Sequence, residues 1–232
     1  MNKILIVDDD RNICEILEFN LKSEGFDVTC CLSAEEALEK VNEDLDLILL
    51  DVMMGGMSGY KMAETLRNDQ NLTPIIFLTA KDTENDMLTG FSVGGDDYIS
   101  KPFSIKEVVA RVKAVLKRTN TNLLPSDETN NALIAVKDLI INPKLKEATI
   151  KGESLLLTKT EFELLFLLAS NGNRIFSRQN IINNVWKATP YITERTVDVH
   201  ITRLRKKLGD YACLITNRSG YGYRFDNNIL EK

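Results

Sequence analysis

The stretch Ile4-Leu5-Ile6-Val7-Asp8-Asp9-Asp10 decides the fold of the first half of the chain. Four consecutive apolar residues predict a short buried strand, and three aspartates end it. Further short apolar runs follow it along the chain, at Val28 to Cys31, Leu45 to Leu50, Ile75 to Leu78 and Tyr98 to Ile99. Each has the length of a strand, so these runs are expected to form one sheet.

Segments with helical spacing separate these runs, among them Arg11 to Ser23, Ala34 to Asn42 and Ile105 to Arg118. Strands that alternate with helices predict an α/β fold, a doubly wound parallel sheet with helices on both faces. In such folds the ligand site lies at the carboxyl ends of the strands, near the point where the strand order reverses. We therefore expect function at that edge of the sheet.

The pattern changes after Arg118. Residues 119–130 are polar and aperiodic, which predicts a linker between a domain at residues 1–118 and a second domain at residues 131–232. The second domain is expected to be α+β. Its predicted elements are strands at Leu139 to Ile141 and Ala148 to Ile150, a helix opened by a capping box of Thr158 and Glu161, helices at Arg178 to Trp186 and Arg195 to Leu208, and a hairpin at Arg218 to Phe225.

Composition fits an ordinary globular protein of 232 residues, with 44% hydrophobic and 27% charged residues. The net charge of -5 combines roughly -9 for residues 1–118 with roughly +4 for the rest, so the second half carries a nucleic-acid signal. The apolar opening is too short for a signal peptide or a membrane span, which predicts a cytoplasmic protein without membrane attachment. The cysteines have no CxxC spacing and are expected to be free thiols: Cys14, Cys30, Cys31 and Cys213.

Polar residues end four of the predicted strands: Asp8 to Asp10, then Asp51, Thr79 and Lys101. Carboxylates crowded at one sheet edge repel each other unless a cation neutralises them, and oxygen ligands suit Mg2+. With a lysine and a hydroxyl beside them, they indicate a phosphoryl-transfer pocket in which Asp51 is the nucleophile. Taken alone, an aspartate triplet before a helix is also typical of solvated N-cap residues.

The first 118 residues resemble the receiver domain of two-component response regulators, a flavodoxin-like (βα)5 fold. The resemblance is carried by Ile6 to Asp9, Leu50 to Met53, Leu78 to Lys81 and Asp96 to Phe103. It implies that Asp51 accepts phosphate from a sensor histidine kinase, and that Mg2+ is bound by Asp8, Asp9, Asp51 and the carbonyl of Met53. It further implies that Lys101 stabilises the phosphoryl group, that Thr79 and Tyr98 report it by changing rotamer, and that Lys101-Pro102 is cis.

Two departures from the receiver pattern matter. Gly55 stands where proline is common, so we expect a more mobile loop after Asp51. The charged residues that mediate dimerisation in similar regulators are matched by Asp96, Asp97, Glu107, Arg111 and Lys113, but Met87 replaces a basic partner. A homodimer formed on phosphorylation, weakened by one missing ion pair, is the expectation. The alternative is a solvated charged face.

The segment Arg195 to Leu208 predicts the DNA-reading helix. Its buried stripe is expected to comprise Val197, Ile201, Leu204 and Leu208. The opposite face is expected to bind DNA, through base edges or phosphates, with Arg195, Thr196, Asp198, Val199, Thr202, Arg203, Arg205 and Lys206. His200, the only histidine, is expected nearer the buried side as a packing or phosphate-contacting residue, because no nucleophile or metal partner is evident.

Residues 131–227 resemble the winged helix-turn-helix domain of the OmpR/PhoB subfamily. The matching segments are Leu157 to Leu165, Ser177-Arg178, Val185-Trp186, Arg195 to Leu208 and Gly220 to Phe225. The resemblance implies promoter DNA, read as direct repeats, and RNA polymerase as partners. In the wing, Ser219 occupies the place of a common arginine, so Arg218 is expected to contact a DNA phosphate instead. Thr202 lacks a positive charge that some relatives have there.

The leading hypothesis is therefore a phosphorylation-dependent transcriptional regulator, which is not an enzyme beyond the phosphorylation and dephosphorylation of its own Asp51. One alternative is a phosphatase or phosphotransferase with Asp51 as nucleophile; the haloacid-dehalogenase type needs a second aspartate where Met53 stands. Another alternative is a constitutive DNA-binding protein whose receiver does not switch. The intact set of acidic residues, Thr79 and Lys101 argues against it.

Overall fold

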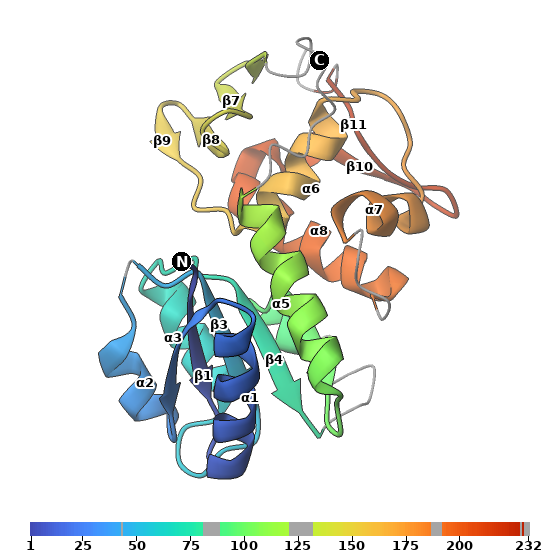
Figure 1. Cartoon of the computed structure of the whole chain (residues 1–232). Helices are drawn as coiled ribbons and strands as arrows, with labels where there is room; N and C mark the ends of the chain where they lie inside the picture. The colour runs from blue at the N-terminus through green and yellow to red at the C-terminus, as the bar shows by residue number, and fades with distance from the viewer. Residues whose placement is uncertain (43, 81–88, 121–131, 187–191, 228, 230–232) are drawn as a thin grey trace. The chain divides into compact units, whose positions relative to one another are not determined.

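The computed structural model describes residues 1–42, 44–80, 89–120, 132–186, 192–227 and 229 (Figure 1). The chain divides into two compact units, Met1–Asn120 and Thr121–Lys232, each with its own hydrophobic core. We call them the receiver unit and the effector unit, after the domains that the two segments resemble in sequence.

The receiver unit is built on a five-stranded parallel sheet in the order β2-β1-β3-β4-β5. The strands are β1 (Lys3–Val7), β2 (Asp27–Cys31), β3 (Leu47–Asp51), β4 (Ile75–Thr79) and β5 (Asp97–Ser100). The strand order reverses between β1 and β3, so the carboxyl ends of these two strands flank the switch point of a doubly wound fold. The predicted sheet is thereby confirmed.

Three helices connect strands of this sheet, α1 (Arg11–Ser23), α2 (Ala34–Lys40) and α3 (Gly59–Asn68), and α5 (Ile105–Asn120) follows β5; residues 89–92 are also helical. Helices α1 and α5 cover one face of the sheet, and α2 and α3 lie on the other (Figure 1). Side-chain caps begin three of them, from Asp10, Ser33 and Ser58. Helix α2 ends two residues before the predicted Asn42, because Val41 adopts extended backbone. Helix α5 instead continues to Asn120, two residues into the predicted linker.

Apolar side chains that alternate along the strands bury both faces of this sheet. On the side of α1 and α5 the core contains Ile4, Ile6, Leu17, Leu21, Leu47, Leu49, Ile76, Leu78, Ile99, Val108 and Val112. Helix α3 starts at Gly59, where a Cβ atom would lie 2.0 Å from the carbonyl oxygen of Asp51. Only glycine allows the chain to pass so close behind the end of β3.

The effector unit opens with a four-stranded antiparallel sheet of β6 (Ile134–Val136), β7 (Leu139–Asn142), β8 (Glu147–Ile150) and β9 (Glu153–Ser154). Three helices follow, α6 (Lys159–Ala169), α7 (Arg178–Val185) and α8 (Glu194–Leu208), then a 3-10 turn η2 (Gly209–Leu214) and a hairpin of β10 (Ile215–Arg218) and β11 (Gly222–Phe225). The predicted hairpin is confirmed, although its first strand begins three residues earlier than expected. The capping box of Thr158 and Glu161 is also confirmed.

The predicted stripe of α8 lies in the effector core, where Val197, Ile201, Leu204 and Leu208 are buried. His200 is buried as well, with its ring 5.2 Å from that of Trp186, so it is a packing residue. The hairpin packs onto the backbone before α7. Phe176 and Tyr223 exchange backbone hydrogen bonds, and a Cβ atom on Gly222 would lie 2.0 Å from the carbonyl oxygen of Phe176.

Two findings bear on the compositional expectations. Across the described ranges, none of the helices combines the length and the apolar character that a bilayer crossing requires. All four cysteines are free thiols; Cys14 and Cys31 are buried, Cys30 is partly buried and Cys213 is exposed.

Candidate functional site

Three carboxylates meet at the carboxyl ends of β1 and β3. One oxygen from each of Asp8, Asp9 and Asp51 lies within 4.8 Å of the others. Asp8 and Asp51 are buried, and Asp9 is exposed. Asp10 turns away from this group to cap α1, accepting the backbone N–H of Asn12 at 2.8 Å. The aspartate triplet thus divides: Asp8 and Asp9 join the acidic group, and Asp10 caps the helix.

Lys101 supplies the positive charge at this edge. Its Nζ lies 2.7 Å from Asp8 Oδ2 and 3.2 Å from Asp51 Oδ2. Burial lowers the pKa of Lys101, but the bonds to both carboxylates outweigh it and raise the pKa above its ordinary value. Burial also raises the pKa of Asp51; the Lys101 ammonium opposes this rise and Asp8 adds to it. Lys101-Pro102 is cis, as expected.

The remaining predicted receiver residues differ in how deeply they are buried. Thr79 ends β4 and is fully buried, and its carbonyl oxygen accepts the backbone N–H of Lys101 at 2.6 Å. Tyr98 points into the unit, 5% exposed, with its ring 6.4 Å from that of Phe91. Met53 follows Asp51 at the surface, and its backbone N–H donates to Asp51 Oδ1 at 3.4 Å.

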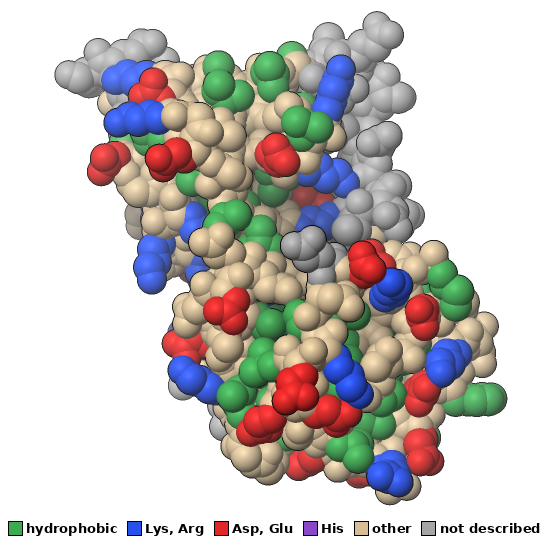
Figure 2. Space-filling model, turned by 90° about the vertical axis from the view of Figure 1, so that its left-hand side faces the viewer, with side chains coloured by type: hydrophobic (Ala, Val, Ile, Leu, Met, Phe, Trp, Pro, Cys, Tyr) green, Lys and Arg blue, Asp and Glu red, His purple; other side chains and the backbone are tan. Residues whose placement is uncertain are grey.

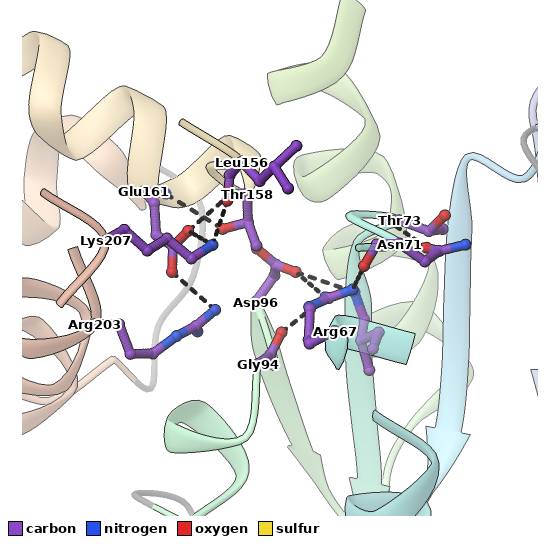
Figure 3. A network of polar contacts seen from close by, with 11 residues as sticks. Arg67, Asn71, Thr73, Gly94, Asp96, Leu156, Thr158, Glu161, Arg203 and Lys207 are labelled. Carbon is purple, nitrogen blue, oxygen red and sulfur yellow. Dashed lines mark hydrogen bonds and ion pairs between the residues drawn. The ribbon is translucent and has the colours of Figure 1, made fainter. Parts of the chain in front are cut away.

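Three of the residues expected on a charged dimer face, Asp96, Asp97 and Arg111, are buried within the receiver unit. Asp96 is 2% exposed, and its Oδ2 accepts the backbone N–H of Ile75 and lies 3.5 Å from Arg67 Nη2 (Figure 3). Arg67 also donates to the carbonyl oxygens of Asn71 and Gly94. These side chains tie α3 to the start of β5, so Asp96 serves the fold.

Asp97 and Arg111 form the second buried pair, at 3.0 Å, and are 1% and 2% exposed. Arg111 also donates to Glu107 Oε1, through Nε at 3.1 Å and Nη2 at 2.8 Å. Glu107 and Lys113 reach the surface, where Lys113 pairs with Glu24 at 2.5 Å. Met87 lies outside the described residues.

Fewer of the residues expected to read DNA from α8 are exposed than the sequence pattern predicts. Arg195, Thr202 and Lys206 are exposed, and Val199 is partly exposed. Thr196 is 2% exposed, and its hydroxyl lies 3.3 Å from that of Thr193, the N-cap of the helix. Arg205 donates from Nε and Nη2 to the carbonyl oxygen of Ile215, which holds the hairpin. Thr196 and Arg205 are thus used by the fold.

Arg203 is also used by the fold, in a buried ion cluster that joins α8 to α6 (Figure 3). Glu161 is fully buried; its Oε1 lies 2.9 Å from Arg203 Nη2 and its Oε2 lies 2.6 Å from Lys207 Nζ. Glu161 Oε2 also accepts the backbone N–H of Thr158, and Lys207 donates to the carbonyl oxygen of Leu156. The capping box was predicted, but the ion cluster was missed. Its signal was a glutamate inside a stretch of apolar helix residues.

Asp198 links α8 to α7 and to the hairpin. Its Oδ1 accepts Arg178 Nε and the Tyr223 hydroxyl, both at 2.7 Å. The Arg178 guanidinium lies 5.0 Å from the centre of the Tyr223 ring. Burial, followed by the bond to Asp198, raises the pKa of Tyr223, so its hydroxyl remains a donor at neutral pH. Sequence reasoning assigned Asp198 to base reading and missed this network.

The hairpin presents its tip to solvent. Arg218 and Ser219 are both exposed, and Arg218 pairs with Gly222 at the end of the ladder. In the receiver unit, acidic side chains gather on the surface (red in Figure 2), in keeping with its roughly -9 charge. By sequence, the net charge is roughly -9 for residues 1–118 and roughly +4 for the rest.

Comparisons with known proteins agree with the two-domain architecture. The family "Response regulator receiver domain" matches residues 4–113, and the family "Transcriptional regulatory protein, C terminal" matches residues 152–225. Response regulator DrrB of Thermotoga maritima, an OmpR/PhoB homologue, is 32% identical over 97% of this chain and 99% of that chain, with a TM-score of 0.51. A mutant of RitR is 27% identical over 97% of this chain and 99% of that chain, with a TM-score of 0.73.

A single-unit structure is similar as well. A two-component response regulator from Clostridium difficile is 32% identical over 52% of this chain and 100% of that chain, with a TM-score of 0.50. The fold and the acidic site together define a receiver joined to a winged-helix DNA-binding domain. The chain belongs to the two-component response regulators, of the OmpR/PhoB type.

Proposed function

We propose that this response regulator is switched by phosphorylation of Asp51 and controls transcription by binding promoter DNA. The observation that carries the proposal is the placement of the Asp51 carboxylate, 3.2 Å from Lys101 Nζ and grouped with Asp8 and Asp9 at the switch point of the sheet. A phosphoryl group on Asp51 would lie beside the ammonium group of Lys101. That positive charge would stabilise the negative charge of the phosphoryl oxygens.

The same residues fit a divalent cation. Three carboxylates with ligand oxygens within 4.8 Å carry more negative charge than the single Lys101 ammonium offsets. Their all-oxygen donor set is the one that Mg2+ prefers. Asp8, Asp9, Asp51 and the carbonyl of Met53 would hold it. Mg2+ held there would supply positive charge to a phosphoryl group on Asp51, in addition to that of Lys101.

The phosphoryl donor is a sensor histidine kinase, as receiver domains imply. In the transfer, an Asp51 oxygen forms a bond to phosphorus while the bond between phosphorus and the kinase's histidine nitrogen breaks, giving an acyl phosphate. Lys101 and the Thr79 hydroxyl donate to its oxygens. The raised pKa of Lys101 keeps the ammonium charged at neutral pH. Transfer to water later restores the Asp51 carboxylate.

Phosphorylation is then read inside the receiver unit. Thr79 is buried beside Lys101, and Tyr98 is nearly buried, so an inward shift of Thr79 would change the space available to Tyr98. We infer a phosphorylation-promoted homodimer whose contacts include the surface groups Glu107 and Lys113. That region is supported by buried residues of the same unit, Asp96, Asp97 and Arg111.

The effector unit binds DNA through its exposed groups. Arg195, Val199, Thr202 and Lys206 line the open face of α8, and Arg218 sits at the hairpin tip. An exposed arginine and lysine on a packed helix suit a major groove, and Arg218 suits a phosphate. The two effector units of a dimer would bind two half-sites arranged as a direct repeat. RNA polymerase would be a further partner at the promoter. The protein would act in the cytoplasm, where its thiols stay reduced.

The test is intact-mass spectrometry of the full chain after incubation with acetyl phosphate and Mg2+, for wild type and Asp51→Asn, together with DNA binding of both. We expect one phosphoryl adduct in the wild type, none in the variant, and tighter DNA binding only by the modified protein. No adduct, from acetyl phosphate or from a cognate kinase, would replace the proposal with constitutive DNA binding. An adduct without tighter DNA binding would overturn the switch.

A further inference from the structure

The loop between β3 and α3 is held at two points by carboxylates from other parts of the receiver unit. The Gly55 backbone N–H donates to Asp9 Oδ2 at 3.0 Å, and the Met57 backbone N–H donates to Glu35 Oε1 at 3.0 Å. Gly55 is the position where the sequence departs from the common proline. Since proline has no N–H, the bond to Asp9 exists only because the residue is not proline.

Asp9 is the member of the acidic group that needs such support. Asp8 and Asp51 are buried and bonded to Lys101. Asp9 is exposed, and within the described part of the chain the Gly55 N–H is the one hydrogen-bond donor to its carboxylate. An exposed aspartate without a partner would sample several rotamers, most of them pointing into water. With this bond, an Asp9 oxygen stays within 4.8 Å of ligand oxygens of Asp8 and Asp51.

We propose that the backbone N–H of Gly55 is a positioning group for the divalent-cation site, which keeps Asp9 in its ligating position before the cation arrives. The inference rests on the proposed function, because it requires the acidic group to bind a cation. Groups that orient a ligand in this way, without touching the metal, contribute about 10- to 100-fold in metal affinity in other proteins. A carboxylate oxygen has two lone pairs and a carboxylate has two oxygens, so Asp9 can accept from Gly55 and still offer an oxygen to a cation.

Two substitutions at one position isolate this hydrogen bond. Gly55→Pro removes the N–H. Gly55→Ala retains it, and an alanine Cβ atom would meet no atom within 4 Å. Mg2+ is titrated by calorimetry into the EDTA-treated full chain. We expect Gly55→Pro to bind Mg2+ about tenfold more weakly than wild type, and Gly55→Ala to stay within about twofold. Equal affinities of the two variants would overturn the inference, as would tighter binding by Gly55→Pro, which would mean that the N–H competes with the cation.

Glu35→Ala separates support of the ligand from support of the loop. It removes the acceptor of Met57 and leaves the bond between Gly55 and Asp9 in place. We expect a smaller loss of Mg2+ affinity than in Gly55→Pro. A loss as large as in Gly55→Pro would show that loop rigidity, not the N–H of Gly55, sets the affinity. A wild-type chain that binds no Mg2+ would refute the proposed cation site itself, a result distinct from equal affinities of the variants.

Amide exchange provides a measurement that does not depend on Gly55→Pro folding correctly. The exchange rate of the Gly55 amide is compared between wild type and Asp9→Ala by NMR, in metal-free protein. Loss of a hydrogen bond to a charged acceptor should accelerate exchange by about tenfold. The Met57 amide, bonded to Glu35, is the internal control and should not change. Unchanged exchange at Gly55 would overturn the inference.

Discussion

The two units place their functional side chains in different ways. In the receiver unit, Asp8, Asp51, Thr79 and Lys101 come to one place because each ends a strand of a parallel sheet, or follows one directly. In the effector unit, the candidate DNA-binding residues share one helix, α8, and their availability depends on what packs against it. Arg203 is bonded to α6 through Glu161, whereas Lys206 is exposed.

This difference shows which kind of site a sequence pattern can specify. The topology of a parallel sheet brings the carboxyl ends of its strands to one edge. The position of a residue just after a buried apolar run can therefore be predicted without knowing which side chains surround it. A helical position fixes only a direction around the axis. Whether a basic residue in that direction meets water or a buried carboxylate is decided by a distant part of the chain, such as Glu161, which lies far before Arg203 and Lys207 in the sequence.

The largest effect is expected from the buried ion cluster of the effector unit. Glu161→Ala leaves Arg203 and Lys207 without their shared carboxylate, and should lower the free energy of unfolding of this unit by about 3–5 kcal/mol. Urea unfolding followed by fluorescence of Trp186, the single tryptophan, measures it. The control is Glu153→Ala at an exposed position of β9, expected within about 0.5 kcal/mol of wild type. Similar losses in both variants would mean that the cluster does not tie α8 to α6.

A smaller effect is expected from Asp198, which joins α8 to the hairpin. Asp198→Ala removes the acceptor of Arg178 and Tyr223 and should cost about 1–3 kcal/mol in the same unfolding measurement. Asp198→Asn keeps an oxygen acceptor in the same place, so it should lie between Asp198→Ala and wild type. If Asp198→Ala unfolds like wild type but loses sequence preference on DNA, the original assignment of Asp198 to base reading is correct.

Much of the fold was predictable. The five strands of the receiver, the capping box at Thr158 and the buried stripe of α8 all follow from periodicity and apolar runs. Helix α3 was not among the predicted segments, and it begins at Gly59, required by the backbone of Asp51 behind it. Among the site residues, the burial of Asp96 and the bond from Arg205 to the hairpin were not predictable, because Asp96 binds the backbone of Ile75 and Arg205 that of Ile215, which local periodicity does not reveal.

DNA binding sharpens the comparison on α8 itself. Lys206 is exposed, so Lys206→Ala should remove one phosphate contact and reduce the slope of log affinity against log salt by about 0.9, without a change in unfolding free energy. The measurement is fluorescence anisotropy with a labelled random-sequence duplex at several salt concentrations. Lys144→Ala, at an exposed lysine outside α8, is the control. An identical slope in both variants would place the DNA-binding face elsewhere.

The smallest effect is expected at Asp51, in the stability of metal-free protein against pH. Burial raises the pKa of folded Asp51, and Lys101 offsets this only in part. The folded state therefore holds a proton in the window between the ordinary aspartate pKa of about 3.9 and the raised value. Stability contributed by this group falls as the pH rises through that window and stays lower above it. Asp51→Asn has no such loss, so it should be the more stable protein at neutral pH, measured by calorimetry in EDTA. The advantage should shrink as the pH falls below the window. If Asp51→Asn were less stable than wild type at neutral pH, the ion pair with Lys101 would stabilise ionised Asp51 by more than burial destabilises it. The ionised Asp51 would then not lower the free energy of unfolding.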